Sequence, residues 1–205
     1  MGTLNPGLFT SSRDEWGTPP HLFNALNDIF IFTLDPCASD LNHKTPVYFT
    51  REQDGLSRSW HEPIDALGVH SQRVFVNPPY GKHVAAWVAK TAEEHAQGVD
   101  AVCLLPARTD TAWFQEYCPR HVLFLRGRLC FELPCAVCGV PVTRRYRLPT
   151  QTKDDDPIPF CTAHAPAGLR AIRNTAPFPT CLFFYLRAPY DLRPLKKLGR
   201  FVDVY

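Results

Sequence analysis

The sequence lacks the long apolar run that a membrane-spanning helix requires. No segment approaches the roughly 20 consecutive apolar residues needed to cross a bilayer, and no basic stretch followed by an apolar one opens the chain as a secretory leader would. These absences argue against a membrane partner, and we expect a cytoplasmic protein. The 205 residues suffice for one sizeable domain with a small insertion.

Neither sign of charge dominates the chain, and nothing indicates a disulfide framework. A net charge of +2 permits a nucleic-acid partner if the basic residues cluster, but it does not establish one. The eight cysteines of a cytoplasmic protein are better explained as thiols or metal ligands than as disulfides. With 45% hydrophobic and 20% charged residues, the composition is that of an ordinary globular protein.

The most informative segment is Asn77-Pro78-Pro79-Tyr80, which directly follows the apolar run 74–76. Such a motif suits methyl transfer to an amino nitrogen whose lone pair is delocalised into a planar conjugated system. The Asn77 side-chain oxygen and the Pro78 carbonyl can each accept one N–H of that amine, which frees its lone pair for attack. The prolines fix the backbone, and Tyr80 offers an aromatic face for a flat substrate. A plain Pro-Pro turn that closes a strand is the simpler alternative.

Apolar periodicity predicts strands that alternate with helices, which indicates an α/β layered fold with helices on both faces of the sheet. Thr18 is the predicted N-cap of the first helix, with Pro19 at its first position. Asp35 and Asn77 follow predicted strands, so they are expected to face one crevice at the carboxyl edge of the sheet. The predicted helices cover 19–30, 84–95 and 109–117, and the predicted strands cover 31–34, 47–49, 74–76, 101–105, 122–125, 129–131 and 181–186.

Four metal-binding side chains are arranged in two closely spaced pairs. Cys135 and Cys138 are separated by two residues, and after 22 more residues Cys161 and His164 repeat that spacing. Two such pairs, each in one tight turn, are typical of a structural tetrahedral zinc site. The alternative is a set of unrelated thiols and a surface histidine. The remaining cysteines lie in or beside apolar segments, where packing roles are expected.

The composition divides the chain into three parts. Residues 1–13 lack periodicity and are predicted to be a flexible tail; 14–132 and 176–205 form the main domain, and the Cys- and Pro-rich stretch 133–175 is a zinc-knuckle insertion. Within the insertion, Arg144, Arg145 and Arg147 surround an aromatic residue, as in a nucleic-acid groove. A solvated charge run, balanced by the acidic residues 154–156, explains the same pattern.

Taken together, seven short blocks in the same order resemble one family, the phage-type DNA N6-adenine methyltransferases (phage Dam). The resemblance implies a Rossmann-like domain that uses S-adenosylmethionine and acts on adenine in double-stranded DNA, in the host cytoplasm if a phage encodes it. The oligomeric state is left open. The blocks are Glu15-Trp16-Gly17-Thr18-Pro19, Leu34-Asp35-Pro36-Cys37-Ala38, Asp54-Gly55-Leu56, Asn77-Pro78-Pro79-Tyr80-Gly81, Leu104-Leu105-Pro106-Ala107-Arg108-Thr109-Asp110, Gly127-Arg128-Leu129 and Ala176-Pro177-Phe178-Pro179.

The resemblance also implies roles for individual residues. Phe131 would pack against the flipped base, and Arg108 and Arg128 would contact DNA, although Arg108 could instead pair with Asp110. The catalytic motif would be Asn77, Pro78, Pro79 and Tyr80, and the cofactor would meet Trp16, Thr18, Pro19, Asp35, Pro36, Cys37 and Asp54.

The chain departs from the usual methyltransferase pattern at the first strand. The glycine-rich turn is absent and Pro36-Cys37-Ala38-Ser39 stands in its place. Only 41 residues separate Asp35 from Asn77, too few for two full helix–strand units, so Glu52 and Asp54 both remain candidates for the cofactor's ribose. The motif logic alone also fits methylation of RNA or of a protein glutamine. A catalytically dead scaffold that binds nucleic acid through its zinc site is the alternative from another class.

Overall fold

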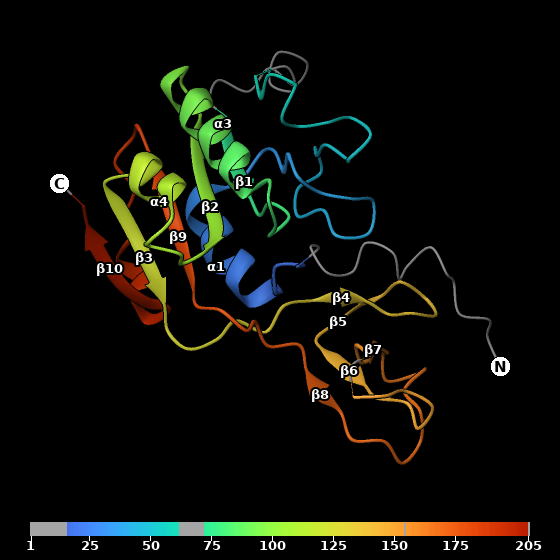
Figure 1. Cartoon of the computed structure of the whole chain (residues 1–205). Helices are drawn as coiled ribbons and strands as arrows, with labels where there is room; N and C mark the ends of the chain where they lie inside the picture. Colours follow the sequence, from blue (N-terminus) through green and yellow to red (C-terminus); the bar gives the residue numbers. More distant parts are fainter. Residues whose placement is uncertain (1–15, 62–71, 154, 205) are drawn as a thin grey trace.

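A central five-stranded mixed sheet organises the protein in the computed structural model, which describes residues 16–61, 72–153 and 155–204 (Figure 1). The strand order is β1-β2-β9-β3-β10. Strand β1 pairs parallel with β2, whereas β9 lies antiparallel between β2 and β3, and β10 is antiparallel to β3. The strands are β1 (Arg73–Val76), β2 (Asp100–Pro106), β9 (Thr180–Tyr185), β3 (His121–Leu125) and β10 (Gly199–Asp203).

Helices cover both faces of this sheet. Strands β2 and β9 are buried along their whole length, as expected for strands covered on both sides. On one face, α1 (Pro20–Phe30) packs Phe30 against Phe184, with ring centroids 6.0 Å apart. On the other face, α4 (Ala112–Tyr117) packs Phe114 against Phe183 at 4.9 Å. Helix α3 (Val84–Ala96) covers that second face too, since Thr91 contacts the Cys103 thiol there.

The polar segments of interest gather at one edge of the sheet. Strands β1, β2 and β3 point the same way, so the residues that follow them lie at a common edge. Leu34 forms a parallel bridge with Val74, which adds the segment that ends in Asp35 to that edge. Because β9 runs in the opposite direction, the segment before it, which contains Phe178, reaches the same edge. Between β9 and β10 the chain forms the 3-10 helix η2 (Arg193–Lys197).

Residues 133–175 contain two small sheets and their own apolar cluster. Strands β4 (Leu133–Pro134) and β5 (Pro141–Val142) pair with each other. The second sheet has the order β7-β6-β8, built from β7 (Ile158–Pro159), β6 (Arg144–Tyr146) and β8 (Ile172–Arg173). Four residues form the buried cluster here, separate from the main core: Cys135, Ala136, Tyr146 and Phe160. The assignment of this stretch as a zinc-knuckle insertion stays a prediction.

The mixed α/β class was predicted correctly, but several local expectations were wrong. The first helix begins at Pro20 with Pro19 as its N-cap, and Thr18 makes no capping bond. Ile31 adopts a left-handed conformation with φ 48°, which ends the helix and prevents a strand from starting there. The helix predicted over 109–117 begins at Ala112. The strands predicted over 31–34, 47–49 and 129–131 reduce to isolated bridges at Leu34, Asp35, Tyr48 and Cys130.

Two expectations concern membranes and the chain terminus. None of the described helices combines the length and the apolar character needed to cross a bilayer. The tail predicted over 1–13 lies outside the described residues.

Candidate active site and metal centre

A hollow at the carboxyl edge of the sheet brings together residues from three distant parts of the chain. It encloses about 360 Å³, open mouth included. Seven of the predicted cofactor-binding and catalytic residues line it. They come from the segment before α1 and from the segments that follow the Leu34 bridge and β1: Trp16, Thr18, Asp35, Cys37, Asn77, Pro78 and Pro79. The sequence did not indicate two further polar side chains that line it, Asn42 and Lys44.

The Asn77 carboxamide is held at both ends. Its Nδ2 donates to the Trp16 carbonyl, and its Oδ1 accepts from the Tyr80 hydroxyl at 2.8 Å. The same hydroxyl lies 3.1 Å from the Leu104 carbonyl. Burial raises the pKa of Tyr80 well above its ordinary value, so the phenol stays protonated as a donor. These contacts fix which end of the Asn77 amide is the oxygen and leave its second lone pair available.

Four aromatic rings pack edge-to-face beside the motif, and we call them the aromatic quartet: Trp16, Tyr80, Phe131 and Phe178. Phe131 lies 5.3 Å from Trp16 and 5.7 Å from Tyr80 between ring centroids. Phe178 lies 5.9 Å and 5.5 Å from the same two rings. The sequence did not single out Phe178 as a site residue. Tyr80 is 7% exposed and Phe131 is fully buried, so both rings are almost completely covered in this conformation.

Asp35 is a buried carboxyl group in the wall of the hollow. Only 4% of it is exposed, and its Oδ2 accepts from the Lys44 backbone N–H at 3.1 Å. Burial raises its pKa to about 6, although the backbone N–H groups of Lys44 and Cys37 oppose the shift. The pKa of the Cys37 thiol lies well above its ordinary value, chiefly because the thiol is buried and secondly because the Asp35 charge is nearby. Cys37 is therefore a neutral packing group and not a nucleophile.

Two further features of the hollow concern its polar lining. The Thr18 hydroxyl is buried and has no hydrogen-bond partner among the described residues. A buried polar atom without a partner costs free energy unless a ligand or water satisfies it.

Lys44 forms an ion pair with Glu132 at 3.1 Å, and Gly17 exchanges backbone hydrogen bonds with Glu132 at 3.0 and 2.8 Å. Glu132 directly precedes 133–175, so these contacts connect the lining of the hollow to the start of that segment.

The other predicted cofactor residues lie near the hollow but do not line it. Pro19 and Pro36 are buried. Asp54 and Glu52 are both exposed, and Asp54 occupies a turn with φ 49°. The turn is nevertheless adjacent, because a side chain at Gly55 would lie 2.1 Å from the Pro36 carbonyl oxygen.

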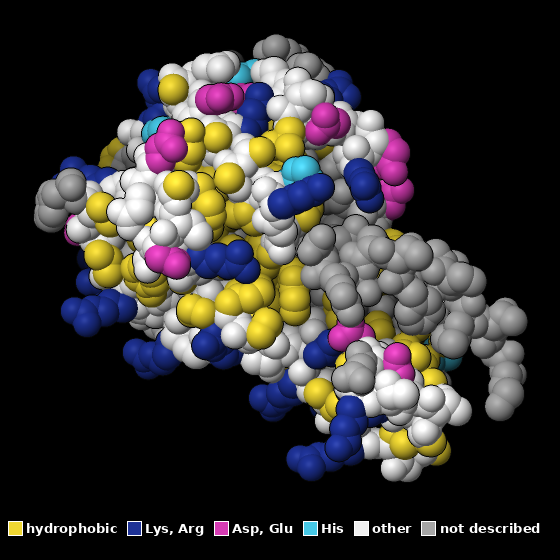
Figure 2. Space-filling model, in the orientation of Figure 1, with side chains coloured by type: hydrophobic (Ala, Val, Ile, Leu, Met, Phe, Trp, Pro, Cys, Tyr) yellow, Lys and Arg dark blue, Asp and Glu magenta, His cyan; other side chains and the backbone are white. Residues whose placement is uncertain are grey.

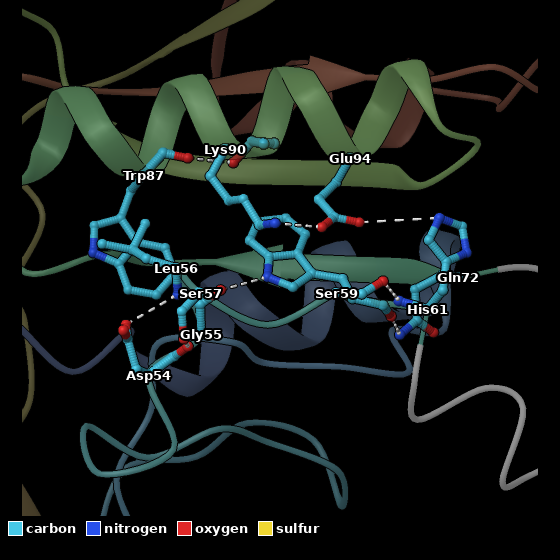
Figure 3. A network of polar contacts seen from close by, with 12 residues as sticks. Asp54, Gly55, Leu56, Ser57, Ser59, His61, Gln72, Trp87, Lys90 and Glu94 are labelled. Atoms are coloured by element: carbon cyan, nitrogen blue, oxygen red, sulfur yellow. Dashed lines mark hydrogen bonds and ion pairs between the residues drawn. The ribbon is translucent and has the colours of Figure 1, made fainter.

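A polar network anchors the Asp54 turn to α3 (Figure 3). The Trp60 indole donates to the Gly55 carbonyl at 2.8 Å, and Gln72 donates to the Trp60 carbonyl. Buried Glu94 on α3 contacts Lys90 at 2.7 Å and His61 at 4.0 Å. The network places the turn firmly beside the sheet.

The predicted DNA-contacting arginines differ in their surroundings. Arg108 is exposed and lines a second hollow with Tyr80, Lys82 and Trp113, and it forms no ion pair with Asp110. Arg128 and Arg144 are exposed as well, whereas Arg145 is half-buried.

The aromatic residue among these arginines does not face solvent. Tyr146 is buried in the small cluster, which contradicts the expected stacking surface. The Arg147 guanidinium donates to the Thr152 and Asp155 carbonyls, so it closes a loop. Asp155 accepts from Thr152 and therefore belongs to the same loop.

The predicted metal ligands converge. The ligand atoms of Cys135, Cys138, Cys161 and His164 all lie within 4.8 Å of one another. Cys138 Sγ and Cys161 Sγ are 3.8 Å apart, which matches the edge of about 3.8 Å expected for thiolates held tetrahedrally at about 2.3 Å from one ion. His164 presents Nδ1, 3.2 Å from Cys161 Sγ. Gly139 has φ 74°, the left-handed conformation that closes the first knuckle.

Comparison with known proteins identifies the class to which this fold and site belong. A sequence model of the family described as DNA N-6-adenine-methyltransferase (Dam) matches residues 7–152. The chain belongs to this family, and the resemblance predicted from the sequence is confirmed. The match ends before Cys161, so it includes only the first knuckle.

Two curated phage proteins are similar to the chain. A DNA N-6-adenine-methyltransferase of Escherichia phage T1 is 33% identical over 107 residues, which cover 51% of this chain and 40% of that protein. A DNA N-6-adenine-methyltransferase of Haemophilus phage HP1 (strain HP1c1) is 27% identical over 113 residues, covering 54% of this chain and 60% of that protein. The chain thus spans less than two thirds of the length of either relative.

Proposed function

We propose that the protein is an S-adenosylmethionine-dependent methyltransferase that acts on the N6 amino group of adenine in double-stranded DNA. The observation that carries the proposal is the fixed Asn77 carboxamide at the wall of a polar hollow, in a chain of the DNA N-6-adenine-methyltransferase family. On this proposal the sheet with helices on both faces is a variant of the Rossmann-like methyltransferase fold.

The hollow suits the proposed cofactor in its polar chemistry. S-adenosylmethionine carries a transferable methyl group on a sulfonium centre, together with an amino-acid end and a ribose. The unpartnered Thr18 hydroxyl would bond the amino-acid end, and Asp35 would accept from a cationic or hydroxyl group. Trp16 and Cys37 supply apolar lining, while Pro19, Pro36 and Asp54 would support the site from outside the hollow.

The amine would be captured by two oxygen acceptors. The free lone pair of Asn77 Oδ1 and the Pro78 carbonyl, which no described hydrogen bond uses, would each accept one N–H of the adenine amino group. Both bonds strengthen as the nitrogen becomes cationic in the transition state, so they favour the reaction and not merely binding. The proton is lost after transfer, and the chemistry requires neither a strong base nor a metal ion.

The base must leave the duplex to reach these acceptors, because its amino group is not accessible within the stack. The aromatic quartet fills the space beside Asn77, so a base can enter only if Tyr80 separates from Phe131 or from Phe178. Their faces would then hold the base, with a contribution of about 1–3 kcal/mol for each stacked ring.

The four Cys and His ligands would hold one structural zinc ion. The apolar cluster in 133–175 has only four buried members, too few to stabilise a fold of that length by burial alone. Metal binding would supply the missing folding free energy. On this proposal the zinc takes no part in methyl transfer, and 133–175 extends the DNA-binding surface.

The test is to incubate the purified protein with methyl-labelled cofactor and, separately, unmodified duplex DNA, duplex RNA and a protein mixture. We expect label in DNA alone, recovered as N6-methyladenine after digestion. DNA in which every adenine is already N6-methylated is the matched control and should accept no label. Label in RNA or protein, or in a different base, would overturn the proposal.

A further inference from the structure

Two arginines lie directly opposite each other on the small sheet of 133–175. In the ladder of β6 and β8, Arg144 is the register partner of Arg173, and both side chains are exposed. Directly opposed residues project from the same side of an antiparallel pair with Cβ atoms about 4.5–5.5 Å apart, and like charges in that position destabilise the sheet. The arrangement therefore costs folding free energy unless an anion lies between the two guanidinium groups.

The neighbouring arginines of this segment differ from Arg144 and Arg173, because their guanidinium groups are occupied or enclosed within the protein. The Arg147 guanidinium is occupied by the Thr152 and Asp155 carbonyls. Arg145 is half-buried with its Nε enclosed. Arg144 and Arg173, by contrast, have neither an ion pair nor a side-chain hydrogen bond with any described residue. Their donors remain available to a ligand from solvent.

The distribution of charge points to an anionic partner of considerable size. Residues 133–175 contain six Lys and Arg but only three Asp, which gives this segment a net charge of +3, whereas the whole chain carries +2. The rest of the protein is thus slightly acidic. Figure 2 shows Lys and Arg side chains spaced along the lower edge of the molecule, from the sheet to this segment. Such a row suits a polyanion better than a small metabolite.

The arginine pair is connected to the aromatic quartet through Asn174. Asn174, which follows Arg173, is 1% exposed and donates through Nδ2 to the Phe131 carbonyl at 3.1 Å. Its carbonyl accepts from the Phe131 N–H at 3.0 Å, and its N–H donates to the Thr143 carbonyl at 2.8 Å. Asn174, next to Arg173, is therefore bonded to Phe131 of the aromatic quartet, and Thr143, next to Arg144, is bonded to Asn174.

From these observations we propose that Arg144 and Arg173 together bind one phosphate group of the DNA backbone and set the position of the duplex over the aromatic quartet. The inference rests on the proposed DNA substrate. Two planar guanidinium groups offer charge-assisted, bidentate hydrogen bonds to a single phosphate. A phosphate contact carries no sequence information but fixes the register of the duplex. The bound phosphate also removes the repulsion between the two side chains, so the pair favours the complex over the free protein.

The experiment measures how DNA affinity depends on salt. Each phosphate neutralised contributes about 0.9 to the slope of log affinity against log salt. For Arg144→Gln combined with Arg173→Gln we expect about tenfold weaker binding of a short unmodified duplex and a slope smaller by about one. The control is Arg120→Gln combined with Arg187→Gln, which removes the same charge from exposed positions before β3 and after β9, at the edge of the sheet opposite the aromatic quartet. The control should retain the wild-type slope.

The outcomes separate the phosphate pair from its alternatives. An unchanged slope, or an equal change in the control, would overturn the proposal, and a decrease of two would contradict a shared phosphate. The melting temperature of the free double variant should equal or exceed that of the wild type, because repulsion is relieved; a lower value would show that the arginines stabilise the fold instead. If the wild-type protein methylates no DNA, the proposed function itself is refuted. If the double variant is active and keeps the wild-type slope, only the proposed role of the arginine pair is refuted.

Discussion

The Tyr80 hydroxyl donates a hydrogen bond to Asn77 Oδ1 at 2.8 Å, within the same four-residue motif. The tyrosine thus contacts the catalytic candidate directly, in addition to offering a ring for the base. Since Asn77 Nδ2 is bonded to the Trp16 carbonyl, the amide is oriented before any substrate arrives. Preorganised acceptors of this kind require no rearrangement at the moment of reaction.

The Tyr80 contact predicts different effects for two substitutions. Tyr80→Phe keeps the ring and loses one neutral hydrogen bond, worth about 1 kcal/mol, so kcat should fall about fivefold with little change in KM. Tyr80→Ala also removes a stacking surface worth about 1–3 kcal/mol, and KM for DNA should rise as well. Steady-state kinetics on duplex DNA provides both numbers. Equal damage from Phe and Ala would show that the ring does not stack on the base.

Asp35 predicts a pH dependence with a definite sign. Burial raises its pKa from 3.8 to about 6, so between these values the folded protein binds more protons than the unfolded chain. The Asp35 contribution to the free energy of unfolding therefore falls as pH rises from about 4 to about 6. Asp35→Asn should remove this slope and raise the stability at pH 7, by at most about 3 kcal/mol.

Cofactor binding should show the opposite trend. The ionised Asp35 is the better acceptor, so the cofactor dissociation constant of the wild type should decrease as pH rises through about 6. For Asp35→Asn the constant should be larger and nearly independent of pH in that range. Calorimetric titrations at several pH values test both statements. If the two proteins show the same pH dependence, Asp35 is not a cofactor ligand.

The zinc hypothesis predicts one tightly bound ion per chain, which elemental analysis of protein purified without chelator measures directly. Cys135→Ser combined with Cys138→Ser should abolish zinc binding and weaken DNA binding, while cofactor affinity persists. Cys103→Ser combined with Cys181→Ser is not a suitable control, because both residues are buried in the main core. Cys130→Ser is preferable, since this half-buried thiol lies outside the cluster. A protein with no zinc and an unaltered hydrogen-exchange pattern in 133–175 would contradict the hypothesis.

The sequence predicted those parts of the fold and site that depend on short-range patterns. Strands such as 74–76 and 101–105 were found because apolar runs bounded by polar residues suit a buried sheet, and the two knuckles were found because ligand spacing is local. The antiparallel position of β9 between β2 and β3 could not be derived, since pairing between strands that lie far apart in the sequence leaves no local periodicity.

The residues missed in the site share one cause. Lys44, Glu132 and Phe178 acquire their positions from contacts across long stretches of chain. The position of Tyr146 was predicted wrongly for a related reason. A residue between arginines looks exposed, but successive side chains of a strand point to opposite faces, so the Tyr146 side chain packs in the small buried cluster. Thr18 resembles an N-cap in sequence, yet Pro20 places the cap at Pro19 and leaves the Thr18 hydroxyl for the hollow.

The central claim is that the Asn77 side-chain oxygen accepts the hydrogen bond of the reacting amine. Single-turnover methyl transfer to duplex DNA, measured together with cofactor affinity, tests it in Asn77→Ala. We expect the transfer rate to fall by at least about two orders of magnitude, comparable to the loss of one oxyanion-hole donor, while the cofactor dissociation constant changes less than about threefold. A transfer rate close to that of the wild type in Asn77→Ala would contradict the account.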